Sequence, residues 1–154
     1  MNGIITVTLN PAIDVHYYAD KFVKGADNMM SERIDYAAGK GINVSRALKS
    51  VGVSAEAFML LGEENASKYL LLAKDYGVPI SSITTSGTVR ENISINTPKS
   101  ETRLCIRGNE VSPAVLPVLA SQIVRKLTPD MAVVFSGSLP KGISQGDFIS
   151  FVMI

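Results

Sequence analysis

Several features are scarce in this sequence of 154 residues, and each scarcity excludes a class of protein. A single cysteine, Cys105, excludes an internal disulfide framework and a zinc site built from several cysteines. The formal net charge is only +1, too little for the phosphate neutralisation that drives non-specific nucleic-acid binding, so no nucleic-acid partner is expected. No apolar run reaches the length of a membrane span, so no membrane partner is expected either.

The composition is that of a globular protein. Apolar residues make up 46% of the chain and charged residues 19%, which excludes a disordered chain of low hydrophobicity and high net charge. The length fits one domain or part of a larger one. The sequence opens with Asn2 and Gly3 and has no basic patch and apolar signal core there, so we expect a soluble, cytoplasmic protein.

Short apolar runs alternate along the chain with stretches of helical spacing. This alternation predicts an α/β protein with a doubly wound parallel sheet. The predicted buried strands are 4–9, 55–61 and 131–135. The predicted helices are 42–51, 66–76, 113–127 and a last one from about 144. Ser112 is expected to cap the third helix, with Pro113 in its first turn.

Other strands alternate apolar and polar residues, as strands with one solvated face do. They lie near 14–19, 31–37 and 89–107 and predict a separate, half-exposed sheet; a further strand is expected at 80–85. The final residues, 148–154, are apolar and contain no helix stop, so the chain is expected to be cut within a helix.

The sharpest motif is Ala-Ala-Gly-Lys-Gly-Ile-Asn at 37–43, where a strand enters a helix through glycines. Glycine lets backbone amides approach a ligand closely, and a helix N-terminus favours anions or oxygen-rich groups. Asn43 can hydrogen-bond a hydroxyl through both amide atoms. An ordinary tight strand–helix turn explains the glycines equally well. The phosphate-binding P-loop pattern fails at Ile34 and Gly41, and the dinucleotide pattern fails at Val44.

Two polar residues follow predicted buried strands. Asp14 ends the segment Asn-Pro-Ala-Ile-Asp at 10–14, and Ser138 lies in Ser-Gly-Ser-Leu-Pro at 136–140. Because open α/β sheets bind ligands beyond the carboxyl ends of their strands, Asp14 is a candidate acceptor for sugar hydroxyls and the Ser138 segment offers hydroxyls and amides. A solvated turn aspartate and a plain Ser/Gly turn are the alternatives. The serine segment lacks the Gly-x-Ser-x-Gly frame of a nucleophile elbow.

Arg90, His16 and Cys105 also carry groups that could bind a ligand or take part in catalysis. Arg90, in Thr-Val-Arg-Glu-Asn at 88–92, can hold a phosphate by two hydrogen bonds, although an arginine on an edge strand is more often a solubility device. His16 is the sole histidine and has no arguable serine or carboxylate pairing, so it is expected at a surface or interface. Cys105 is expected to be a strand residue without a catalytic role.

In combination and in this order, the motifs resemble the N-terminal half of a ribokinase-like (PfkB-type) sugar kinase. The matching segments are 6–14, 37–46, 88–92, 100–102 and 135–140. The resemblance covers essentially all of 1–154 and is greatest to the 1-phosphofructokinase and tagatose-6-phosphate kinase group. It implies the N-terminal part of a ribokinase-like doubly wound sheet, with the alternating strands as a small β-sheet lid.

The resemblance also implies an activity, namely ATP-dependent phosphorylation of a ketohexose phosphate. Fructose-1-phosphate, fructose-6-phosphate and tagatose-6-phosphate remain alternatives for the acceptor. The residues expected to hold sugar hydroxyls are Asp14, Gly39 and Asn43. The residues expected at or near the existing phosphate are Lys40, Arg90 and Ser138. ATP and Mg²⁺ are the implied cofactors, and a homodimer through the lid is the implied assembly.

The sequence departs from the family pattern in four places. The segment Ser-Glu-Thr-Arg-Leu-Cys-Ile-Arg-Gly at 100–108 is only loosely like the family's lid segment. Ala38 replaces the first of two glycines, and its methyl would narrow the backbone approach to the sugar. Met29 follows Asn28 where a basic residue is common, which removes one phosphate contact. The C-terminal half, with the catalytic aspartate of a Gly-Ala-Gly-Asp segment and most of the ATP and Mg²⁺ site, is absent. We therefore expect no catalytic or metal-binding residue in this chain, and no activity from it alone.

Two other functions are alternatives to the kinase hypothesis. The chain could be a non-catalytic domain that binds a sugar phosphate or dimerises through its lid. A nucleotide-binding dehydrogenase is disfavoured by the failed dinucleotide pattern. A fragment, a truncated gene product and a proteolysed remnant would all give this sequence.

Overall fold

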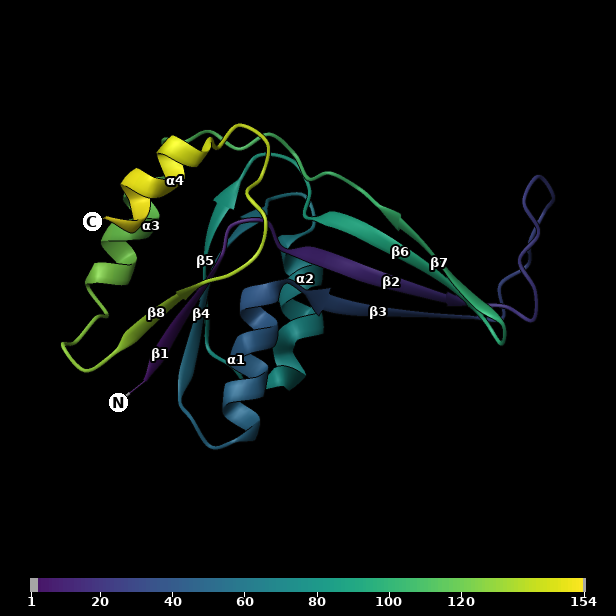
Figure 1. Ribbon diagram of the computed structural model, residues 1–154, viewed down its shortest axis with the longest axis horizontal. Helices are drawn as coiled ribbons and strands as arrows, with labels where there is room; N and C mark the ends of the chain where they lie inside the picture. Colours follow the sequence, from purple (N-terminus) through teal and green to yellow (C-terminus); the bar gives the residue numbers. More distant parts are fainter. Residues whose placement is uncertain (1–2, 154) are drawn as a thin grey trace.

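Two four-stranded sheets meet at one end in the computed structural model, which describes residues 3–153 (Figure 1). The first sheet has the order β5-β4-β1-β8 and is entirely parallel. Its strands are β1 (Ile4–Thr8), β4 (Ala55–Gly62), β5 (Ile80–Thr85) and β8 (Ala132–Phe135). The helices are α1 (Lys40–Ser50), α2 (Ala66–Ala73) with the 3₁₀ helix η1 (Lys74–Tyr76), α3 (Val115–Val124) and α4 (Gln145–Val152).

The first sheet is covered on both faces because its central strands are apolar on both sides. In β4, Phe58 and Leu60 pack with α3 and α4, whereas Met59 and Leu61 pack with α1 and α2. Figure 1 shows these helix pairs on opposite sides of the sheet. This arrangement confirms the predicted doubly wound parallel sheet. Within residues 3–153, no helix has the length and apolar character needed to cross a membrane.

The second sheet consists of two inserted hairpins. Its strands are β2 (Ala12–Tyr18), β3 (Glu32–Ala38), β6 (Arg90–Thr97) and β7 (Ser100–Cys105), in the order β3-β2-β6-β7. The hairpins β2-β3 and β6-β7 are antiparallel, and they join through the parallel pair β2-β6. Figure 1 shows this sheet extending away from the first. The alternating strands predicted near 14–19, 31–37 and 89–107 therefore lie in a sheet of their own.

Ion pairs and buried tyrosines fasten the second sheet to the first layer. Lys68 of α2 contacts Asp35 of β3 and Glu91 of β6, each at 2.9 Å. Hydrogen bonds from Arg33 and from Lys68 lower the pKa of Asp35 from its ordinary value. Burial raises the pKa of Tyr69, so its hydroxyl stays protonated and donates to the carbonyl oxygen of Ala38 at 3.1 Å.

The helix ends differ from the predictions in detail. α3 begins at Val115, because Pro113 and Ala114 form a turn in front of the helix and Ser112 Oγ accepts from the Ala114 amide at 3.4 Å. The predictions that Ser112 caps this helix and that Pro113 lies in its first turn are therefore wrong, because Ala114 is the cap residue. Pro117 lies in the first turn instead, where its missing N–H is tolerated. The helix predicted through 148–154 ends at Val152. The expectation about the start of the chain involves Asn2, and the expectation that the chain is cut within a helix involves Ile154. Both residues lie outside the described residues.

Candidate functional site

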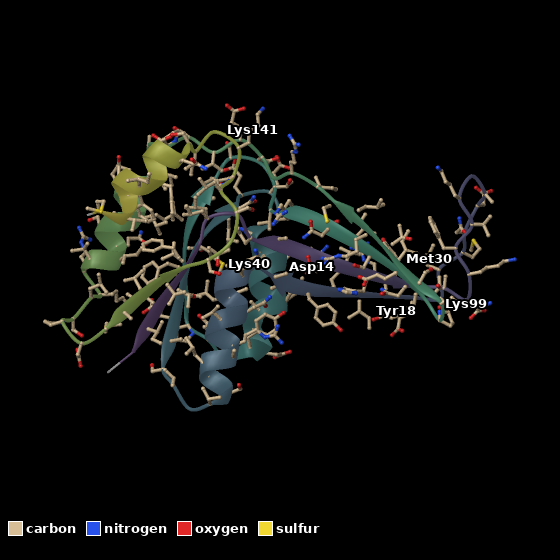
Figure 2. The ribbon with its side chains drawn as sticks, in the orientation of Figure 1. Asp14, Tyr18, Met30, Lys40, Lys99 and Lys141 are labelled. Atoms are coloured by element: carbon tan, nitrogen blue, oxygen red, sulfur yellow. The ribbon has the colours of Figure 1, made fainter. Side chains whose placement is uncertain are left out.

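A cavity of about 370 Å³, called the inner cavity below, lies where the two sheets meet. Its lining comes from the β1–β2 junction, the start of α1, the adjoining strands of the second sheet and the loop after β8. All the site residues predicted from the sequence line it: Asp14, Gly39, Lys40, Asn43, Arg90 and Ser138. Figure 2 shows Asp14 and Lys40 close to this junction. Its size is that of a small-molecule site.

Asp14 lies in β2 and is paired in register with Asn92 of β6. The Asn92 side-chain amide donates to Asp14 Oδ1 at 2.8 Å. Among the described residues Asp14 Oδ2 receives no hydrogen bond, and the buried Asn92 Oδ1 has no partner either. Because a carboxylate only accepts hydrogen bonds, it fixes the orientation of the Asn92 amide. Two acceptor oxygens are thus left for a ligand that donates, such as a sugar with several hydroxyls.

The glycines at the start of α1 let the helix approach β1. Gly39 has a φ of 145°, and a Cβ there would lie 2.9 Å from Thr8 Cγ2. A Cβ at Gly41 would overlap Thr8 Oγ1 and lie 3.1 Å from the Val7 carbonyl oxygen. The first intrahelical hydrogen bond runs from the Asn43 amide to the Gly39 carbonyl, so the amides before it are free of helical partners. These glycines pack the helix tightly and also open its N-terminus toward the inner cavity.

Arg90 is held at the junction by backbone carbonyls. Its terminal nitrogens donate to the carbonyl oxygens of Asn10 and Ile106 at 3.3 and 3.4 Å. Its Nε is buried and has no partner among the described residues. No carboxylate pairs with the guanidinium in the part of the chain described. Its charge is therefore available to an anionic ligand.

Three polar side chains of the lining were missed by the sequence reasoning. Asn10 donates to Ser138 Oγ at 3.1 Å and so orients that hydroxyl. Asn92 shares one face of β6 with Arg90, two residues away, and strand alternation could have identified it. Arg103 reaches the inner cavity only through the pairing of β7 with β6, opposite Ser94. No local sequence signal specifies that register.

Four further residues were singled out in the sequence, and only Ala38 of these lines the inner cavity. Met29 is exposed and does not line the inner cavity, whereas Ala38 does. His16 stacks edge to face on Tyr36, with ring centroids 5.4 Å apart, and lies outside the lining. Cys105 is exposed at the end of β7.

The described residues contain no cluster of ligands that could by itself hold the Mg²⁺ that accompanies ATP. Asp14 is the one carboxylate in the lining of the inner cavity, and Asn92 already occupies one of its oxygens. Nowhere in residues 3–153 do three His, Cys, Asp or Glu side chains gather in a way that could hold a metal ion. Magnesium in kinases is bound by carboxylates together with substrate phosphates. The donor set here suits a polar organic ligand instead.

Comparisons with known proteins agree with this geometry. Residues 6–148 match the sequence model of the pfkB family of carbohydrate kinases. The 1-phosphofructokinase of Escherichia coli strain K12 is 30% identical over 150 residues, which cover 97% of this chain and 48% of that protein. The 1-phosphofructokinase of Xanthomonas campestris pv. campestris is 33% identical, over 92% of this chain and 45% of that protein.

A solved structure shows the same fold. Phosphofructokinase-2 from Escherichia coli, in complex with fructose-6-phosphate, superposes with a TM-score of 0.91 at 23% identity. The match covers 99% of this chain and 51% of the other. The chain thus spans about half the length of the relatives it matches.

Proposed function

Since the chain belongs to the pfkB family of carbohydrate kinases, we propose that it is the sugar-phosphate-binding part of a kinase acting on a ketohexose phosphate. In the whole protein, ATP would donate its γ-phosphoryl group to a hydroxyl of that sugar. The observation that carries the proposal is the inner cavity, where the free acceptor oxygens of Asp14 and Asn92 face the same space as the unpaired charge of Arg90.

Each side chain has a role in this proposal. Asp14, Gly39 and Asn43 hold the sugar hydroxyls, with Asn92 fixing the Asp14 carboxylate by its 2.8 Å hydrogen bond. Lys40, Arg90 and Ser138 lie at or near the existing phosphate. The acceptor is fructose-1-phosphate, fructose-6-phosphate or tagatose-6-phosphate. ATP, Mg²⁺ and a cytoplasmic location belong to the function proposed for the whole protein.

The second sheet acts in this proposal as a lid over the sugar and as a dimer surface. Exclusion of water by a lid would prevent it from competing with the sugar hydroxyl for the phosphoryl group. Exposed apolar side chains gather on this sheet and on the loop after β2, and such side chains favour association. They are Phe22, Val23, Met29, Tyr36 and Leu104. Sedimentation of the chain with and without Tyr36→Glu tests the dimer, which should dissociate in the variant.

Binding measurements test the site directly. Isothermal titration of the chain with the three ketose phosphates should give saturable binding, and Asp14→Ala should weaken it while thermal unfolding stays unchanged. Asp20→Ala, at an exposed position outside the inner cavity, is the charge-matched control and should bind like the parent. Equal affinity of Asp14→Ala and the parent would mean that Asp14 does not contact the sugar and would contradict the proposal.

A second candidate is a sugar-phosphate-binding domain without catalysis. It rests on the inner cavity, whose polar lining can hold a sugar phosphate without a catalytic step. A coupled ATP-consumption assay on the longest protein that the gene encodes separates the two. Sugar-dependent ADP release supports the kinase, and ligand binding without release supports the binding domain.

A further inference from the structure

A second cavity, called the outer cavity below, adjoins the inner one. It measures about 650 Å³. Asn10, Arg90 and Ser138 line both cavities and form the wall between them. Cys105, Arg107 and Lys141 line only the outer one. The loop that leaves β7 and the loop that leaves β8 thus enclose a space directly beyond the guanidinium of Arg90.

The two cavities differ in whether a carboxylate accompanies their cations. The inner cavity is lined by Lys40, Arg90 and Arg103 but also by the carboxylate of Asp14, which repels an anion. The outer cavity is lined by the cations Arg90, Arg107 and Lys141, and no aspartate or glutamate of the described residues lines it. Lys141 is already paired with Glu110 at 2.9 Å. Arg107 makes no side-chain hydrogen bond or ion pair with any residue in 3–153, so its charge is unpaired.

We propose that the sugar ring lies in the inner cavity and its phosphate in the outer cavity, where Arg107 is a further phosphate-binding and specificity-determining residue. The inference rests on the proposed function and deepens it. A phosphate between Arg90 and Arg107 receives planar guanidinium donors from two sides and avoids the Asp14 carboxylate. Lys40 lines only the inner cavity, so its ammonium group lies near the phosphate but outside the outer cavity.

Cys105 provides a reporter for this assignment, because it is the one cysteine of the chain and lines only the outer cavity. The rate of its alkylation by iodoacetamide, followed by mass spectrometry, therefore measures access to the outer cavity. Fructose-1-phosphate at about ten times its dissociation constant should slow the reaction about tenfold, as mass action requires. Fructose without phosphate, at the same occupancy of the inner cavity, should leave the rate unchanged.

Substitution of Arg107 tests its contribution. Arg107→Gln should weaken fructose-1-phosphate binding about three- to tenfold, toward the lower end because the side chain is exposed. Binding of fructose should not change. Arg125→Gln removes the same charge at the end of α3, away from both cavities, and should bind both sugars like the parent.

The outcomes separate this inference from the proposed function. Loss of fructose-1-phosphate binding in Asp14→Ala, together with an unchanged Cys105 rate in the parent, would place the phosphate in the inner cavity and overturn the inference alone. Protection of Cys105 with unimpaired binding by Arg107→Gln would overturn the role of Arg107. Absence of ketose-phosphate binding by the parent, for each of the three sugars, would overturn both the inference and the proposed function.

Discussion

Replacing Arg90 by alanine should separate recognition of the phosphate from recognition of the sugar ring. The guanidinium donates to two backbone carbonyls at 3.3 and 3.4 Å, and its buried Nε has no partner among the described residues. A hydrogen bond to a charged group contributes about 1.5–3 kcal/mol. Arg90→Ala should therefore weaken phosphosugar binding about ten- to a hundredfold. Affinity for the same sugar without phosphate should barely change.

Arg90 also connects two segments of backbone, so the fold must be measured beside the affinity. The two carbonyl bonds are long, and we expect their loss to lower the free energy of unfolding by only about 1 kcal/mol. Arg90→Lys should restore part of the phosphosugar affinity, since an ammonium ion supplies the charge but not the bidentate geometry of a guanidinium.

The assay is isothermal titration at fixed ionic strength, because a partly exposed charge pair is screened by salt. Fructose-1-phosphate and fructose are each titrated into the parent, Arg90→Ala and Arg90→Lys, and urea unfolding is recorded for each protein. Equal losses of affinity for the two sugars would refute the reasoning. Arg90 would then maintain the junction between the sheets without contacting the phosphate.

Three other changes have defined outcomes. Because the pKa of Asp35 lies below its ordinary 3.8 in the folded state, its contribution to stability is present above that pH and is lost as the pH falls further. Urea unfolding of Asp35→Asn should thus vary less with pH in this acid range than that of the parent, and identical slopes would count against the ion pairs of Asp35 with Arg33 and Lys68. Gly62→Ala should destabilise the chain by about 1–3 kcal/mol in thermal unfolding, since its Cβ would overlap backbone atoms of Gly87 and Thr88; an unchanged melting temperature would mean that the strand ends can separate. The isolated chain should show no ketose-dependent ADP release with ATP, and measurable turnover would contradict the division of the site proposed above.

The fold could be predicted from local sequence patterns because the apolar side chains of the strands recur at a regular spacing. The alternation of Phe58 and Leu60 with Met59 and Leu61 serves both faces of β4, and in β2 the core residues Ile13 and Val15 alternate with Asp14 and His16. Asp14 and Ser138 lie shortly after β1 and β8, and Gly39, Lys40 and Asn43 lie at the start of α1, where open α/β sheets bind ligands. Arg90, at the start of β6, was indicated by the chemistry of its guanidinium instead.

The pairing between strands that are distant in the chain could not be predicted from the sequence. The bond from Asn92 to Asp14 joins residues 78 positions apart and depends on the register of β2 with β6. Arg103 enters the inner cavity only because β7 pairs with β6. The start of α3 was misplaced because Pro113 and Pro117 each suit a first turn, and packing of Leu116 and Leu119 into the core decides between them.

The second sheet projects from the junction by the length of β2, so its far end moves furthest when the sheet rotates there. With a rise of about 3.3 Å per residue, Asp14 lies about 7 Å beyond Ala12, and Tyr18 about 20 Å beyond it. A rotation of about 10° at the junction would shift Asp14 by about 1 Å and Tyr18 by about 3.5 Å. Figure 2 shows Tyr18, Met30 and Lys99 together at this far end. A fluorescent label there would magnify a motion that leaves the ligand contacts nearly unchanged, so the tip is where ligand-induced rotation is easiest to see.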